Sequence, residues 1–156
     1  MSNKKLKRGF TLIEVLIVIG ILAILAGIAL VAINPARQFS QARDSQRLSH
    51  VNTILNAIVQ NIAENRGTFK CNGAEKSIPA TEVTVKAPEG TDGLDLYDCL
   101  VPKYIPDIVQ DPETGTFTSN TAYNTGYKII RDSGSGRVTI SAVAEITENS
   151  PIKATK

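Results

Sequence analysis

A largely apolar run from Phe10 to Ile33 restricts this chain more than any other feature of its sequence. As a helix rising about 1.5 Å per residue, the run would be roughly 36 Å long. The hydrocarbon core of a bilayer is about 30 Å thick, so such a helix can cross it with some tilt. Glu14 is the single formal charge in the run. We therefore predict a membrane-spanning helix over residues 10–33, and its carboxylate needs an explanation.

Glu14 lies near the start of the run, where a charge costs less than the about 2.5–3.5 kcal/mol that applies at the centre of a membrane helix. In the simpler of two interpretations, Glu14 marks the membrane edge and caps Thr11 at the positive end of the helix. In the other, the chain is cut between Gly9 and Phe10. The new ammonium on Phe10 then pairs with the carboxylate, within one helix or between neighbouring helices. We favour the second, because a Gln or Ser would cap at lower cost.

The residues before the run form a short basic leader that contains Lys4, Lys5, Lys7 and Arg8. Basic residues beside a membrane helix are typical of its cytoplasmic flank. An ordinary secretory signal is the alternative, since residues 27–29 have the small-x-small form of a cleavage site. The apolar region of a secretory signal is only about 7–15 residues long and lacks an acid, whereas the run from Phe10 to Ile33 is longer and contains Glu14. Native protein beginning at Leu30 would support the secretory signal, and N-methylated Phe10 would support the cut after Gly9.

Residues 7–14, with the sequence Lys-Arg-Gly-Phe-Thr-Leu-Ile-Glu, closely resemble the class III signal of type IV prepilins and of type II secretion pseudopilins. The resemblance implies that a membrane prepilin peptidase cuts after Gly9 and methylates the new amino terminus of Phe10. It implies that Glu14 directs assembly into a helical homo-oligomer, together with a pilus or secretion assembly platform. It also implies an α+β fold, in which a long N-terminal helix packs on a small antiparallel β-sheet.

Two further features of the N-terminal half bear on packing. Gly20, Ala23 and Gly27 share one helix face, which favours close approach of copies in lipid. Asn34-Pro35 interrupts the helical pattern, and we expect a kink there because Pro35 cannot donate to the helix ladder.

From Ala36 to about Arg66 the pattern is that of an amphipathic helix, ended by Gly67. The apolar stripe comprises Leu48, Val51, Leu55, Ile58 and Ile62, and the other faces carry Arg37, Arg43, Asp44, Arg47, Gln60 and Glu64. His50 is expected to face solvent. We accordingly divide the chain into a leader (1–9), a membrane and assembly helix (10–33), an amphipathic half (34–66) and a head (67–156) that packs on residues 34–66.

In the head, residues 82–86 are expected to form an edge strand and residues 94–100 a short helix. Residues 127–131 and 137–143 flank Ser133-Gly134-Ser135-Gly136, which predicts a hairpin that follows a polar loop. The tail from Thr147 to Lys156 is expected to be loosely held. Cys71 and Cys99 are the two cysteines, and outside the cytoplasm a disulfide between them is permitted. We favour that disulfide over two buried thiols.

No catalytic, cofactor or metal constellation is evident in the sequence. Asp107, Asp111, Glu113 and Asp132 supply oxygens without the spacing of a calcium loop, so we interpret them as solvated loop acids. The chain has 17 Lys and Arg against 15 Asp and Glu, and four of the basic residues lie in the leader. Processing would leave a slight negative charge, which argues against nucleic-acid binding by bulk charge.

These observations predict a non-enzymatic structural subunit, held in the inner or cytoplasmic membrane and then assembled into an extracellular pilus. The alternative within the same class is the major pseudopilin of a type II secretion system, which would form a filament in the periplasm or cell envelope. An alternative of another class is a single-pass, membrane-anchored binding domain that does not polymerise.

Overall fold

The computed structural model describes residues 9–146, 148 and 150–156, and leaves aside the side chains of residues 32 and 33. Residues 1–8, which make up most of the predicted leader, lie outside the described part of the chain. The chain divides into two compact units, and the division falls between Phe39 and Ser40. Each unit is described by itself.

The first unit is helical. Helix α1 (Leu12–Ile33) begins after Thr11 and ends at Asn34, which has the left-handed backbone angles φ 44° and ψ 78°. Asparagine tolerates this region better than most residues. Helix α2 (Pro35–Glu64) begins at the next residue. Proline suits the first position of a helix, where its missing N–H has no intrahelical partner. The predicted interruption is therefore confirmed, as a break between two helices rather than a kink in one.

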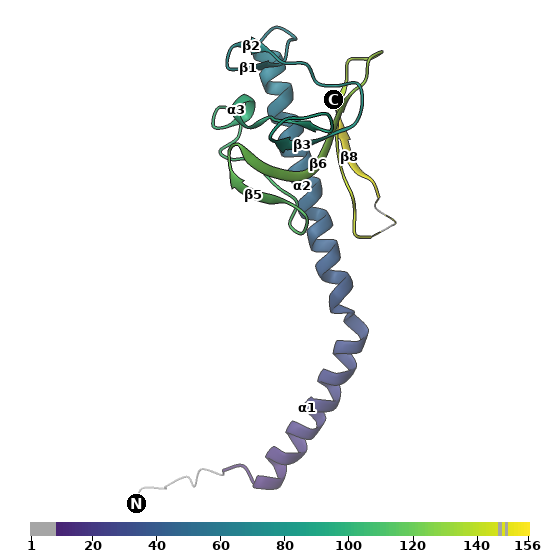
Figure 1. The fold of residues 1–156 in the computed structure, drawn as a ribbon. Coiled ribbons are helices and arrows are strands. Elements are labelled where there is room, and N and C mark those ends of the chain that lie inside the picture. The colour runs from purple at the N-terminus through teal and green to yellow at the C-terminus, as the bar shows by residue number, and fades with distance from the viewer. Residues whose placement is uncertain (1–8, 147, 149) are drawn as a thin grey trace, which may run out of the picture. The chain divides into compact units, whose positions relative to one another are not determined.

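The second unit is an α+β head built on the rest of α2. Its further elements, in chain order, are β1 (Lys70–Cys71), β2 (Ala74–Glu75), β3 (Val83–Ala87), β4 (Gly93–Leu94), α3 (Tyr97–Leu100), β5 (Thr116–Ser119), β6 (Ala122–Arg131), β7 (Val138–Ala142) and β8 (Ile152–Thr155). The main sheet has the order β4-β3-β6-β7-β8, with β5 also paired to β6. All its pairs are antiparallel except β3 with β4. The strands lie across α2 (Figure 1).

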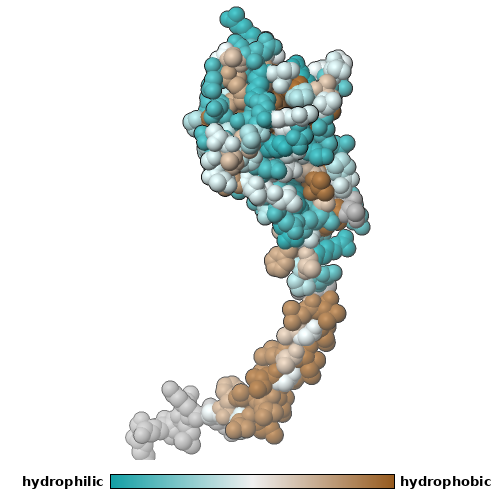
Figure 2. All heavy atoms as spheres, viewed as in Figure 1, coloured by the Kyte–Doolittle hydropathy of each residue, from teal (hydrophilic) through white to brown (hydrophobic). Residues whose placement is uncertain are grey.

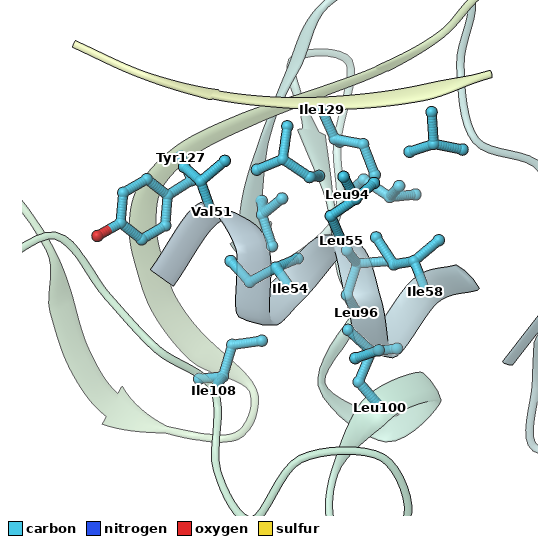
Figure 3. Packing of buried hydrophobic residues seen from close by; sticks show 14 of the residues in the cluster. Val51, Ile54, Leu55, Ile58, Leu94, Leu96, Leu100, Ile108, Tyr127 and Ile129 are labelled. Carbon is cyan, nitrogen blue, oxygen red and sulfur yellow. The ribbon is translucent and has the colours of Figure 1, made fainter. Parts of the chain in front are cut away.

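The core of the head lies between α2 and the sheet. Figure 3 shows Val51, Ile54, Leu55 and Ile58 of α2 packed among side chains from β4, β6 and the segment around α3. The predicted α+β fold is thus confirmed. Gly67 lies just past α2 with φ +93°, and its N–H donates to the carbonyl of Ile62 at 2.9 Å. This is the glycine-ended helix that the sequence predicted.

Three predictions about α2 were wrong. Asp44 and Arg47 are 5% and 2% exposed, although they were assigned to polar faces. Leu48 is 48% exposed, although it was assigned to the buried stripe. His50 is half-buried, and its Nδ1 lies 2.9 Å from the Tyr127 hydroxyl. The buried face of α2 therefore begins with a charged pair one helical turn before its first buried apolar residue, Val51.

The sheet also differs from the sequence prediction in three places. β3 is an interior strand between β4 and β6 rather than an edge strand. The segment before the hairpin, predicted as a polar loop, forms β5 and the first half of β6. The tail forms β8, which pairs with β7 and buries Ile152. The hairpin itself is confirmed, with Lys128 opposite Ser141 and Arg131 opposite Val138.

Candidate functional site

The predicted cleavage position lies in irregular backbone just before α1. Gly9 and Phe10 are both exposed, and the Phe10 side chain is 88% exposed. A Cβ atom added at Gly9 would meet no atom within 4 Å, and its φ is not in the left-handed region. The described chain therefore gives no steric or conformational reason for glycine at this position. Its peptide bond with Phe10 is open to an enzyme.

Thr11 and Glu14 form a capping box at the start of α1. The Thr11 backbone N–H donates to Glu14 Oε2 at 2.9 Å, and the Thr11 hydroxyl donates to the same oxygen at 2.8 Å. The Glu14 N–H donates back to the Thr11 hydroxyl at 3.3 Å. This is the capping contact of the simpler interpretation. All three bonds use groups of Thr11 and Glu14, so a cut before Phe10 leaves every one of their atoms in place.

The rest of α1 presents apolar side chains in all directions. Its segment Leu12–Val31 is 20 residues long with a mean hydropathy of 2.9, and by length and composition it can cross a membrane. Every residue from Leu12 to Val31 is exposed, so no part of the described chain covers it. On the face seen in Figure 2, hydrophobic residues make up most of the surface of this helix. A helix that is apolar on all sides requires lipid or other helices around it.

Two shallow grooves run along α1. One, of about 450 Å³, is lined by Phe10, Glu14 and Val18, which lie one turn apart, together with Val15, Ile17 and Ile19. It combines apolar walls with one carboxylate. The other, of about 580 Å³, includes Ala23 and Gly27. A Cβ atom added at Gly20 or Gly27 would meet nothing within 4 Å. The small residues of this face therefore leave open space on the isolated helix.

Residues 4–30 match a family model, that of the prokaryotic N-terminal methylation motif. The chain carries a class III prepilin-like signal. The motif is characteristic of type IV pilins and pseudopilins, and it implies processing by a prepilin peptidase. The match ends within α1 and does not include the head. Comparison of the whole chain with curated proteins found no match, and comparison with solved structures found none.

The head joins Cys71 of β1 to Cys99 of α3 in a disulfide. Two carboxylates of the head have structural partners. Asp92 pairs with Lys86 at 2.9 Å, and Asp95 accepts hydrogen bonds from the Tyr123 hydroxyl and the Tyr97 N–H. Among the described residues, no group of three or more His, Cys, Asp or Glu side chains is arranged to hold a metal ion.

One group of interacting charged side chains was missed by sequence reasoning. Arg43, Asp44 and Arg47 of α2 meet Asp111 and Glu145 from distant parts of the chain, and we call these five residues the Arg47 cluster. Asp111 is 5% exposed, so its interpretation as a solvated loop acid was wrong. The sequence held one signal: Asp44 and Arg47 continue the spacing of Val51 and Ile54 in the direction of the N-terminus, at steps of three and four.

Proposed function

We propose that this chain is a structural, non-enzymatic subunit of a type IV pilus-like helical filament. The coarser statement, that the chain is a type IV pilin-like or pseudopilin subunit, follows from the methylation motif. The observation that supports assembly into a filament is helix α1, which is exposed from Leu12 to Val31 and has one carboxylate a single turn from the proposed cleavage position. A Gln or Ser would cap the helix at lower cost, so the carboxylate itself favours a charged partner on another copy.

In the proposed pathway, prepilin peptidase removes residues 1–9 and methylates the nitrogen of Phe10. Before assembly, the mature subunit is anchored in the inner or cytoplasmic membrane by residues 10–33. There the Thr11 N–H and hydroxyl hydrogen-bond the Glu14 carboxylate. These contacts lower the cost of holding a carboxylate near hydrocarbon, because they satisfy one of its oxygens.

Assembly then gives Glu14 a charged partner. The groove at Phe10, Glu14 and Val18 is apolar with one carboxylate, so it suits the methylated ammonium and ring of Phe10 from the next copy. A buried charge without its partner is heavily penalised, so this pairing would set the stagger of successive subunits. The open face at Ala23 and Gly27 supports close packing of neighbouring α1 helices.

The proposal places the head, residues 67–156 packed on residues 34–66, outside the cytoplasm. The disulfide between Cys71 and Cys99 supports that location, because disulfides persist in oxidising compartments. The assembly platform would then be that of a pilus. A pseudopilus of a secretion system uses the same motif and is the second candidate. Imaging of surface filaments and a secretion assay, both in a deletion strain, distinguish the two.

The decisive experiment compares Glu14→Ala with Thr11→Ala in cells that express the full chain. Both variants break the side-chain cap, but only Glu14→Ala removes the carboxylate. We expect Glu14→Ala to insert and be processed yet to be nearly absent from filaments, and Thr11→Ala to assemble far better. Equal defects would mean that Glu14 acts only as a cap. Wild type that forms no filaments would favour the anchored binding domain. Mass spectrometry of the native amino terminus tests the cut and the methylation.

A further inference from the structure

The Arg47 cluster connects α2 to the segment that leads into β8. The Asp44 carboxylate accepts the backbone N–H groups of Glu145 and Ile146 at 2.9 and 3.1 Å. In return, Glu145 Oε1 accepts Arg47 Nη1 at 2.6 Å and Arg43 Nε at 2.5 Å. Arg43 Nη2 donates to the other oxygen of Glu145. Helix α2 and residues 145–146 thus each supply both donors and acceptors. This reciprocal pattern fits only one alignment of the two segments.

The same cluster connects α2 to a second segment, the turn that begins at Asp111. Arg47 Nε donates to Asp111 Oδ2 at 2.6 Å, and Arg47 Nη2 donates to Oδ1 at 3.2 Å. Asp111 Oδ1 also accepts the N–H groups of Glu113 and Thr114, and the Asp111 N–H donates to the Thr125 carbonyl of β6 at 2.7 Å. Asp111 is therefore built into the head, whereas Glu145 joins α2 only to the tail.

Beyond the Arg47 cluster, strand β8 is held mainly by β7, and the Lys156 ammonium that follows it donates to Asn56 Oδ1 of α2 at 2.6 Å on the exposed surface. It is an edge strand that pairs with β7 alone, and of its four residues only Ile152 is buried. An open groove of about 620 Å³ lies between α2 and the start of β8, lined by Gln41, Asp44, Ser45, Leu48, Ile152 and Lys153. By contrast, β3 and β7 bury alternate residues along their whole length. Elements with little buried apolar area open locally at low free-energy cost.

The first two turns of α2 in the head depend on the same contacts. Between Ser40 and Arg47 the buried residues are Asp44 and Arg47, both members of the cluster. Val51, one turn further along, is the first apolar residue of α2 in the core. Residues 40–47 of α2 are therefore attached to the rest of the head mainly through this cluster.

We propose that the Arg47 cluster is a latch that holds β8 and residues 40–47 of α2 on the head, and that opening it releases both while β3, β6 and β7 stay folded. Glu145 is the movable half of the latch, because it is contributed by the tail. Asp111 is the fixed half, because it is bonded to β6. The latch does not depend on filament formation.

The charges around Glu145 make the latch sensitive to acid. Arg43, Arg47, Asp44 and Ser40 face it from α2, and Asp111 and Glu113 approach the same guanidinium from the 111–115 turn. The hydrogen bond from Arg43 lowers the pKa of Glu145 from 4.5 to about 2, against the opposing effect of burial and with further help from Arg47. The stabilisation by this carboxylate is therefore complete above pH 4.5 and is lost as the pH falls towards 2.

Amide hydrogen exchange of the full chain in detergent micelles tests the latch. The variant is Glu145→Gln, which keeps the size of the side chain and removes its charge. The matched control is Glu82→Gln, away from the cluster, which removes the charge that pairs with Lys128 of β6 at 2.9 Å and keeps an amide oxygen to accept the Ser141 hydroxyl of β7. We expect Glu145→Gln to accelerate exchange in residues 152–156 and 40–47 at least about tenfold, since hydrogen bonds to charged groups are the strong ones. Exchange in β3 and β6 should be unchanged, and Glu82→Gln should affect neither segment.

Three results would overturn the proposal: unchanged exchange in β8, equal acceleration in β3 and β6, or a Glu145→Gln protein that does not fold. In the last two cases the cluster would be part of the global core. Arg43→Gln gives an independent measurement, because Arg43 is partly exposed and its loss should produce the same pattern with a smaller amplitude. In wild type, protection factors of β8 should fall before those of β6 as the pH is lowered from 5 to 3. In the Glu145→Gln variant, lowering the pH from 5 to 3 should not reduce the protection of β8 relative to that of β6.

Discussion

At the scale of single residues, the Arg47 guanidinium is a charge in a place where α2 otherwise buries mostly apolar side chains. Its side chain is 3% exposed and lies within 3 Å of the carboxylates of Asp44, Asp111 and Glu145. Burial by itself would raise the pKa of Asp111. The hydrogen bonds from Arg47 and from the N–H groups of Thr114 and Glu113 outweigh that effect and hold the pKa well below its usual range. Removing any one of these partners leaves a buried charge incompletely paired and destabilises the folded state.

Replacing Asp111 by Asn should therefore destabilise the head. The substitution keeps the shape but leaves Arg47 with two close carboxylates instead of three, so we expect a loss of about 1.5–3 kcal/mol in the free energy of unfolding. This is less than the roughly 3–5 kcal/mol expected for a buried charge with no partner at all. Denaturant unfolding of the full chain in micelles measures it. Asp92→Asn, whose side chain is 81% exposed, is the control and should leave the midpoint nearly unchanged.

At the scale of elements, β6 organises the head because it pairs with β3, β5 and β7. Its pairing with β3 shifts register between Thr84 and Lys86, where Thr125, Gly126 and Tyr127 form an irregular stretch. The Thr125 hydroxyl fills the gap by donating to the Val85 carbonyl at 2.8 Å. Gly126 has φ +76°, and a Cβ atom there would lie 2.8 Å from Thr114 Oγ1 and 2.9 Å from Asp111 Cβ.

Gly126→Ala should accordingly destabilise the head by about 1–3 kcal/mol, through both the left-handed backbone and the collision with the Asp111 turn. The matched control is Gly134→Ala in the β6–β7 turn. Its φ is not left-handed, and the nearest atom to an added Cβ is 3.5 Å away. The measurement is the thermal unfolding midpoint of the two variants and of wild type, and only Gly126→Ala should lower it. Equal midpoints for all three proteins would show that the irregular stretch adapts to a side chain.

At the scale of the whole molecule, the two units are stabilised in different ways. The head has its own core, which includes Tyr127, Phe69 and Ile54 as fully buried side chains. Helix α1 has no such cover within the described chain, so its surroundings must supply its packing. A change on α1 can therefore affect association while the head remains as stable as before.

We expect Gly27→Ile to lower filament yield several-fold, because a large side chain prevents close approach of helices in lipid. Membrane insertion and the free energy of unfolding of the head should be unchanged. Ala29→Ile is the matched control, since two residues along a helix place it on roughly the opposite face. Quantification of sheared filaments against membrane-held subunit gives the measurement. The same loss in both variants, or in neither, would argue against a packing role for the face at Gly27.

The sequence by itself determined the features that depend on neighbours along the chain. These are the apolar helix with its cleavage motif, the interruption at Asn34, the end of α2 at Gly67 and the β6–β7 hairpin. Each follows from local periodicity, from a cap or from a turn, and each could be predicted without knowing the fold.

Only the tertiary structure decided the rest of the head. Arg47 meets Asp111 and Glu145 at sequence separations of 64 and 98 residues, and no local pattern indicates such partners. The burial of Asp44, the interior position of β3 and the order of the tail as β8 have the same origin. A charged residue is assigned to the surface unless its counter-charges are known, and a short strand is recognised only when its neighbour is in place.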